Sequence, residues 1–201
     1  MLVTIMPSDS STLISPAEEL PLLDALEEIF LAEGYRSVTL RALASRLGCS
    51  YRKIYAVAAT KEELFLKVAK RFFDRIVREG WVQSRTEKAL VDRISDYLKV
   101  GIVAAGRASL QFNEDITSLS AGRIIFDAHQ EERIRGLSEL VEEGIRKGEF
   151  EGFHSKLVAE VMITAVKRVR QPDFLATSDL SFSEALAEIS RLIRLGLASR
   201  T

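Results

Sequence analysis

Apolar residues recur at helical spacing along nearly all of this 201-residue chain after Pro21. In the first such segment Leu22, Leu26 and Phe30 follow the spacing of residues that share one buried helix face. No segment shows the period-two alternation, bounded by turn residues, that is typical of a half-buried strand. The pattern therefore predicts an all-α fold, and a hydrophobic content of 47% is sufficient for a substantial core.

Capping residues predict three helices near the N-terminus. Gly34 is suited to end the first, because glycine readily adopts the left-handed conformation that follows a helix. Thr39 and Ser50 are suited to begin a short second and a short third helix, because their hydroxyls can accept from an unpaired backbone amide. The Gly48-Cys49 pair separates these two helices. Two short helices joined by a tight turn are typical of a helix-turn-helix motif.

The segment Thr60-Lys61-Glu62-Glu63 predicts the start of a much longer helix. It has the capping-box pattern, in which the Thr60 hydroxyl bonds the Glu63 amide while the Glu63 carboxylate reaches back to Thr60. We expect this helix to end near Gly80. Further helices are expected over residues 86–105, 124–147, 155–169 and 183–198.

The region around the two short helices is basic. Residues 36–61 include six Lys and Arg and no Asp or Glu, although the whole chain has a net charge of −1. Such a local block is the electrostatic signature of a nucleic-acid site, and a solvated basic face without a partner is the alternative. At the start of the third helix, Arg52 and Lys53 can donate to guanine in the major groove. Tyr51 and Tyr55 can contact phosphates or thymine methyl groups.

Residues 22–66 resemble the DNA-binding domain of the TetR family of repressors. The resemblance implies an all-α fold, with an N-terminal three-helix helix-turn-helix DNA-binding domain over residues 21–66 and a larger C-terminal ligand-binding and dimerisation domain over residues 67–201. Residues 1–20, which contain two prolines and a Ser/Thr-rich stretch, are expected to form a flexible arm. The matching features, in the family's order and spacing, are Glu33-Gly34-Tyr35, Thr39-Leu40-Arg41, Ala44, Leu47-Gly48, Ser50, Ile54-Tyr55 and Lys61-Glu62-Glu63-Leu64.

The resemblance also implies a function. It is that of a cytoplasmic homodimeric transcriptional regulator, a repressor, that binds a double-stranded DNA operator of two half-sites. A small-molecule effector of unknown identity would modulate operator affinity from the C-terminal domain. The candidate DNA-contacting residues, from the basic segment and the resemblance together, are Thr39, Arg41, Ser50, Tyr51, Arg52, Lys53, Tyr55 and Lys61.

Two residues depart from the family pattern. Val57 stands where the family commonly has a phosphate-contacting side chain, and Ala58 stands where it has a core aromatic. A neighbour such as Phe30, Tyr35 or Phe65 must then fill the space, because an uncompensated loss of a buried Phe costs about 3–5 kcal/mol. These departures leave a second hypothesis, a TetR-fold ligand-binding or protein-interaction module that has lost DNA recognition.

Other classes of protein have little support. The chain has no Gly-rich phosphate loop, HExxH motif or nucleophile elbow, so we expect no enzyme and no cofactor. Cys49 is the single cysteine, and a small buried residue is a simpler interpretation than a redox sensor. Asp127, His129, Glu131 and Glu132 lack the spacing of a strong ligand pair, so we expect an acidic surface and no metal. No signal peptide or membrane span is apparent.

The last two long segments carry apolar stripes that have two interpretations. Paired with a second chain, they would form a four-helix dimer interface, as the resemblance favours. Alternatively, they close the core of one chain. The stripes are Leu157, Val161 and Ala165 in one segment and Phe182, Leu186, Ile189 and Ile193 in the other.

Overall fold

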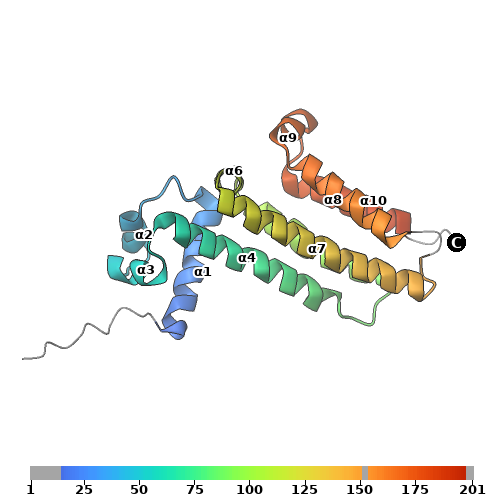
Figure 1. The fold of residues 1–201 in the computed structure, drawn as a ribbon, viewed down its shortest axis with the longest axis horizontal. Helices are drawn as coiled ribbons and strands as arrows, with labels where there is room; N and C mark the ends of the chain where they lie inside the picture. The colour runs from blue at the N-terminus through green and yellow to red at the C-terminus, as the bar shows by residue number, and fades with distance from the viewer. Residues whose placement is uncertain (1–14, 151–153, 198–201) are drawn as a thin grey trace, which may run out of the picture.

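A computed structural model describes residues 15–150 and 154–197, and all regular structure in these ranges is helical. A small N-terminal group of helices lies at one end of a longer bundle, and α4 runs from one into the other (Figure 1). The helices are α1 Pro16–Glu33, α2 Leu40–Arg46, α3 Tyr51–Val57, α4 Lys61–Ser84, α5 Leu90–Arg107, α6 Leu110–Ser118, α7 Ser120–Arg146, α8 Ser155–Val169, α9 Pro172–Ser178 and α10 Phe182–Leu197.

The first helix begins earlier than the sequence pattern indicated. Helix α1 starts at Pro16, so the expectation of a flexible arm up to residue 20 is wrong for residues 16–20. Pro16 occupies the first helical turn, where its missing N–H costs no hydrogen bond. Pro21 lies inside the helix and is exposed, so solvent can satisfy the carbonyl that loses its partner. The rest of the expected arm, residues 1–14, lies outside the described residues.

The three N-terminal helices pack on the start of α4 around fully buried side chains. Leu26, Leu43 and Ile54 come from α1, α2 and α3 and share one core with Phe65 of α4. Tyr35 stacks on Phe65 with ring centroids 4.8 Å apart, and Tyr35 and the half-buried Ala58 both pack against this core. The aromatic residues expected to compensate for Ala58 thus belong to the core that Ala58 contacts.

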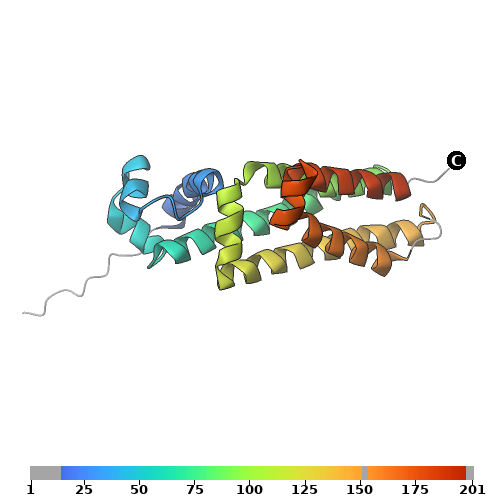
Figure 2. The same ribbon diagram turned by 90° about the horizontal axis from the view of Figure 1, so that it is seen from above.

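This core does not stop at residue 66. Phe72 and Phe73 of α4, Phe112 of α6 and Phe126 of α7 belong to the same buried cluster. Helix α6 lies crosswise between the N-terminal helices and the long bundle (Figure 2). A second cluster, which includes the fully buried Tyr97, follows further along the bundle. The two expected domains thus share apolar packing through α4 and α6.

Helix α4 continues through Gly80 to Ser84, so the predicted end at Gly80 is wrong. A side chain at Gly80 would collide with Arg133 of α7 and crowd Tyr97 of α5, which explains a glycine in the helix interior. The short helices α6 and α9 were not predicted, because each has too few turns for a clear apolar period.

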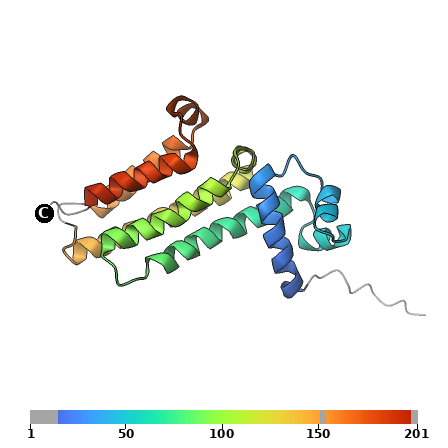
Figure 3. The same ribbon diagram turned by 180° about the vertical axis from the view of Figure 1, so that it is seen from behind.

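Helices α8 and α10 form the outer layer of the bundle, with α10 against α5 and α8 against α7 (Figure 3). Phe182, Leu186 and Ile189 of α10 point inward, so for α10 the alternative of closing the monomer core is correct. In α8, by contrast, Leu157 and Val161 are 63% and 55% exposed.

Candidate nucleic-acid interface and effector cavity

The two short helices begin where their hydroxyl residues predict. The Thr39 side chain accepts a hydrogen bond from the Ala42 amide at 3.1 Å, and the Ser50 side chain accepts one from the Lys53 amide at 3.2 Å. Both hydroxyls therefore serve as caps, and each retains a proton that it can donate outward. Each capped N-terminus is also a place where the helix dipole favours an anion such as phosphate.

Helix α3 has a buried face and an exposed aromatic face. Ile54 and Val57 are buried against α1, α2 and α4, whereas Tyr51 and Tyr55 are exposed. The two tyrosine rings lie edge to face at 4.7 Å, and their hydroxyls are 3.1 Å apart. That hydrogen bond with Tyr51 raises the pKa of Tyr55, so the Tyr55 hydroxyl remains protonated at neutral pH. The exposed face of α3 thus presents two polar-tipped rings.

Several charges of the basic segment are compensated by carboxylates in the fold. Arg41 and Arg52 are exposed and have no hydrogen bond or ion pair within the described part of the chain. The compensated side chains are Arg36 with Asp115, Arg46 with Glu33 and Lys53 with Glu18. The Lys53–Glu18 pair is partly exposed and 3.5 Å long, so it contributes little and can be exchanged for a DNA phosphate.

Lys61 lies beside the other candidate residues but has an internal role. Its ammonium donates to the Val38 carbonyl at 2.7 Å and lies 5.3 Å from the centre of the Tyr35 ring. The residue is half-buried. Lys61 therefore holds the loop between α1 and α2 onto the start of α4, while its charge adds to the basic face.

The loop after α1 is fixed to α6 by one buried carboxylate. Asp115 is fully buried, and its Oδ2 accepts from the Tyr35 amide at 2.7 Å and the Arg36 amide at 3.2 Å. Its Oδ1 accepts from Gln111 at 3.0 Å. Gly34 has φ +71°, and any side chain there would collide with Asp115. Glycine is thus required both by the backbone and by the close approach of α6.

A second carboxylate joins α1 to the bundle. Glu27 is buried and forms an ion pair with Arg75 of α4, and the Arg107 side chain from α5 lies 3.5 Å away. Arg71 contributes a longer contact of 3.7 Å. Together with Asp115, this network makes the position of α1 depend on the relative positions of α4, α5 and α6.

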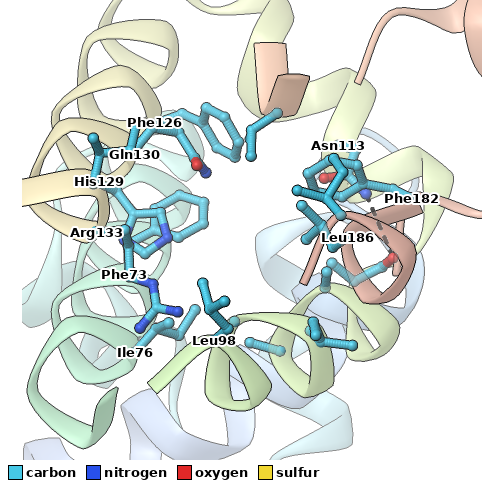
Figure 4. A pocket seen from close by; sticks show the side chains of 18 of the residues that line it. Phe73, Ile76, Leu98, Asn113, Phe126, His129, Gln130, Arg133, Phe182 and Leu186 are labelled. Atoms are coloured by element: carbon cyan, nitrogen blue, oxygen red, sulfur yellow. Dashed lines mark hydrogen bonds between the residues drawn. The ribbon is translucent and has the colours of Figure 1, made fainter. Parts of the chain in front are cut away.

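A largely apolar cavity lies within the bundle, between α4, α5, α6, α7, α8 and α10 (Figure 4). Its volume is about 90 Å³. By the same measure one water molecule requires about 10–15 Å³, so the cavity can hold several. Phe73, Phe126 and Leu186 are among the apolar side chains around it, and the Gln130 amide points into it.

His129 and Arg133 lie one helical turn apart on the α7 wall of this cavity (Figure 4). The His129 ring stacks on Phe73 at 4.8 Å, and its Nδ1 is buried without a hydrogen-bond partner. Burial, followed by the positive charge of Arg133, lowers the pKa of His129 to about 3. The histidine is therefore neutral at physiological pH.

Residues 22–68 match the family described as "Bacterial regulatory proteins, tetR family". This match covers the helix-turn-helix, its caps and the first turns of α4. The N-terminal part of the chain is therefore similar to the TetR family. This confirms the predicted resemblance of residues 22–66 to that family, and the all-α fold is confirmed as well.

Solved TetR-type structures share the fold of the whole chain. A TetR/AcrR-family regulator from Thermobifida fusca is 20% identical with a TM-score of 0.65, covering 91% of this chain and 100% of that one. A regulator from Saccharomonospora viridis in complex with choline is 14% identical with a TM-score of 0.71, covering 92% and 100%. The regulator FadR from Bacillus subtilis in complex with stearoyl-CoA is 14% identical with a TM-score of 0.64, covering 89% and 98%. No curated protein matches the chain.

Within this TetR-type fold, seven of the eight candidate residues lie at or next to the N-terminal ends of α2, α3 and α4, and Tyr55 lies one turn further along α3. Val57 does not belong to that surface, because it is buried at the end of α3. Cys49 is half-buried and packs against the core. This environment agrees better with a small packing residue than with an exposed redox sensor. In the described residues, no cluster of three potential metal ligands occurs, and no helix has the length and apolarity needed to cross a bilayer.

Sequence reasoning missed the residues that connect the TetR-type domain to the bundle. Glu27 was not singled out, and Asp115 lies in a helix that the periodicity did not reveal. The signal that could have found Asp115 is its position three residues after Phe112 and next to Ile116, which places it on the buried face, unlike the adjacent Glu114. Its partners, 79 and 80 residues away, have no local signature.

Proposed function

We propose that this chain is a homodimeric regulator that inserts α3 into the major groove of an operator. A small molecule that fills the cavity would lower or raise the affinity of the protein for this operator. The observation that carries the proposal is the tip of α3, where Tyr51, Arg52 and Tyr55 are exposed on a capped helix. The match of residues 22–68 to the TetR family model supports a regulator rather than an enzyme, acting in the cytoplasm as a repressor.

The charge distribution supports direct base contact by the start of α3. Arg52 is exposed and without an internal partner in the described residues, so its guanidinium is free to bind the guanine edge bidentately. Arg41, at the start of α2, is free in the same sense and is suited to a phosphate. Lys53 would have to leave Glu18 to reach DNA, so we assign it a smaller share of the affinity.

An exposed apolar surface on α8 and α10 supports the dimer. Leu192 and Leu195 of α10 are 69% and 56% exposed, and Leu157 and Val161 of α8 are exposed to a similar degree. Side chains of this size on the outer layer favour burial against a second copy by two-fold symmetry. Such a dimer would present its two α3 helices to successive major grooves, roughly 34–36 Å apart.

Helix α6 supports coupling between the cavity and the DNA-binding helices. Phe112 and Asn113 line the cavity, and Asp115 on the same short helix binds the loop between α1 and α2. A ligand that displaces α6 would therefore move the attachment point of the DNA-binding domain. A coupling free energy of about 1–3 kcal/mol is sufficient for a 5–150-fold change in operator affinity.

Binding assays distinguish the proposed DNA-binding regulator from the alternative, a TetR-type module without DNA recognition. Fluorescence anisotropy with DNA from upstream of the protein's own gene should show site-specific binding. If roughly six phosphates are contacted, affinity should fall by about a thousandfold between ~50 and ~200 mM salt. Binding that is absent, or insensitive to both salt and sequence, would favour the module.

Arg52→Ala is the sharpest variant for the same assay. We expect it to lose about 1–3 kcal/mol of discrimination against a mutated base pair in the site. Arg146→Ala is the matched control, because it removes the same charge from an exposed position at the far end of α7 (Figure 1). Equal specificity in both variants would show that α3 does not read the bases.

A further inference from the structure

The effector cavity contains a half-buried cation, Arg133, that no carboxylate in the described protein neutralises. Among the residues around the cavity, Arg133 has the only charge at neutral pH, and no Asp or Glu lines it. The guanidinium uses Nη2 to donate to the Tyr97 carbonyl at 2.8 Å, and its carbon lies 4.1 Å from the centre of the Tyr97 ring. Its Nη1 is buried and has no hydrogen-bond partner.

Other arginines in the interior of this protein have carboxylate partners. Arg93 binds Glu143 through two hydrogen bonds of 2.8 and 3.0 Å, and Arg75 forms an ion pair with Glu27. Arg133 has only a carbonyl and a ring face, and burial lowers its pKa. An unpaired buried charge costs several kcal/mol, so its retention in a cavity points to a function outside the folding of the apo-protein.

The fold provides space for this guanidinium. A side chain at Gly80 of α4 would collide with Nη1, and one at Gly101 of α5 would approach Nη2 to 2.9 Å. Two glycines on two helices thus leave room for the Arg133 head group beside the cavity. The packing of α4 and α5 therefore accommodates the Arg133 guanidinium specifically at this position.

The remaining wall limits the chemistry of the ligand. Phe72, Ile76 and Leu98 are apolar, and His129 is neutral. Gln130 and Asn113 are the uncharged amide side chains of the wall; the Gln130 amide points into the cavity (Figure 4), whereas the Asn113 amide donates to the Ser109 carbonyl at 3.0 Å. Such a wall suits a hydrocarbon body. A cationic head group would be repelled by Arg133, and a second negative charge would remain unpaired.

On the basis of the proposed function, we infer that the effector is a monocarboxylate with an apolar body, whose carboxylate pairs with the guanidinium of Arg133. The planar guanidinium can offer two N–H groups to one carboxylate, which is the geometry of a strong charge-assisted pair. Binding would supply the counter-charge that Arg133 lacks in the protein alone.

The protein contains an internal reporter for this site. Trp81 is the only tryptophan, and its ring lies edge to face with the Tyr97 ring, with centroids 5.6 Å apart. The Arg133 guanidinium lies over the same Tyr97 ring. Tryptophan fluorescence titrations should be made with three probes of equal chain length, namely octanoate, octan-1-ol and octylamine. We expect octanoate to bind roughly ten- to a hundredfold more tightly than octan-1-ol, and octylamine not to bind.

Arg133→Met should abolish the preference for octanoate over octan-1-ol, whereas Arg133→Lys should keep part of it. Arg93→Met is the matched control, because it removes a half-buried arginine that already has a carboxylate partner, and it should leave the preference unchanged. Melting temperatures of all variants are recorded. We expect Arg133→Met to be no less stable than the parent, whereas a structural role for Arg133 would lower its melting temperature as Arg93→Met does.

Equal binding of octanoate and octan-1-ol, or a preference that survives in Arg133→Met, would overturn the inference. Failure of all three probes to bind would overturn it as well. Operator binding is measured on the same protein preparation without any probe. If operator binding is intact while the preference for the carboxylate is absent, the proposed regulatory function is retained and only the inferred ligand class is wrong.

Discussion

Lowering the pH from about 7.5 to about 5 should destabilise this protein by about 2 kcal/mol through His129 alone. The His129 ring is stacked on Phe73 inside the bundle, and its Nδ1 has no partner. Burial and the nearby Arg133 lower its pKa to about 3 in the folded chain, from an ordinary value of 6.5. Between these two values the unfolded chain binds a proton that the folded chain does not bind.

The sign and size follow from this difference in proton binding. Stability rises with pH wherever the unfolded state holds more protons, so the contribution of His129 is complete above pH 6.5 and is lost as the pH falls below it. Each pH unit below 6.5 removes about 1.4 kcal/mol, until the folded-state pKa near 3 is reached. At a pH of about 5, roughly 1.5 units below the ordinary pKa, the loss is about 2 kcal/mol.

Urea unfolding followed by circular dichroism at several pH values measures this loss. The variant His129→Gln should be less stable than the parent at neutral pH but should lack most of its decline toward pH 5. His154→Gln is the control, because His154 is the other histidine and is exposed at the start of α8. The reasoning fails if His129→Gln declines as steeply as the parent, or if His154→Gln removes the decline.

Two further predictions test the connection between domains and the dimer. Asp115→Asn should lower the free energy of unfolding by about 3 kcal/mol, because hydrogen bonds to a buried carboxylate are worth about 1.5–3 kcal/mol each. Urea titration measures this loss, and a loss below about 0.5 kcal/mol would contradict the prediction. Leu192→Glu should convert the proposed dimer to a monomer in sedimentation equilibrium, whereas Leu110→Glu, at a position 75% exposed on α6, should not. Dimers in both variants would exclude the α10 surface.

The helix-turn-helix and its candidate DNA-contacting residues could be predicted from the sequence because their determinants are local. Thr39, Ser50 and Thr60 each cap a helix through a backbone amide three residues ahead. Such bonds depend on neighbouring residues only, so the sequence contains all the information that they require. The exposed face of α3 follows in the same way from the burial of Ile54 and Val57.

The neutralised charges of the basic segment could not be predicted, because their partners are distant in the chain. Arg36 meets Asp115 of α6, and Lys53 meets Glu18, which lies in a stretch that was expected to be a flexible arm. The start of α1 at Pro16 places that carboxylate beside α3. Local charge counting therefore overstates the free positive charge of this surface.

The direction of the α10 stripe shows the same limit. Periodicity places Phe182, Leu186 and Ile189 on one face of a helix, and this helix forms as expected. The period does not say what the face contacts, and the fold turns it toward the cavity instead of toward a second chain. Leu192 and Leu195 then remain as the outward apolar residues of that helix.

By itself the sequence determined the all-α class, the helix-turn-helix with its caps and the resemblance to the TetR family, because these depend on hydrogen bonds and apolar spacing within a few residues. Only the tertiary structure decided that Arg133 has no carboxylate partner, that His129 is neutral, and that Asp115 holds the loop after α1 to the helix that lines the cavity. Burial and electrostatic pairing depend on which helices meet in space, and no local pattern contains that information.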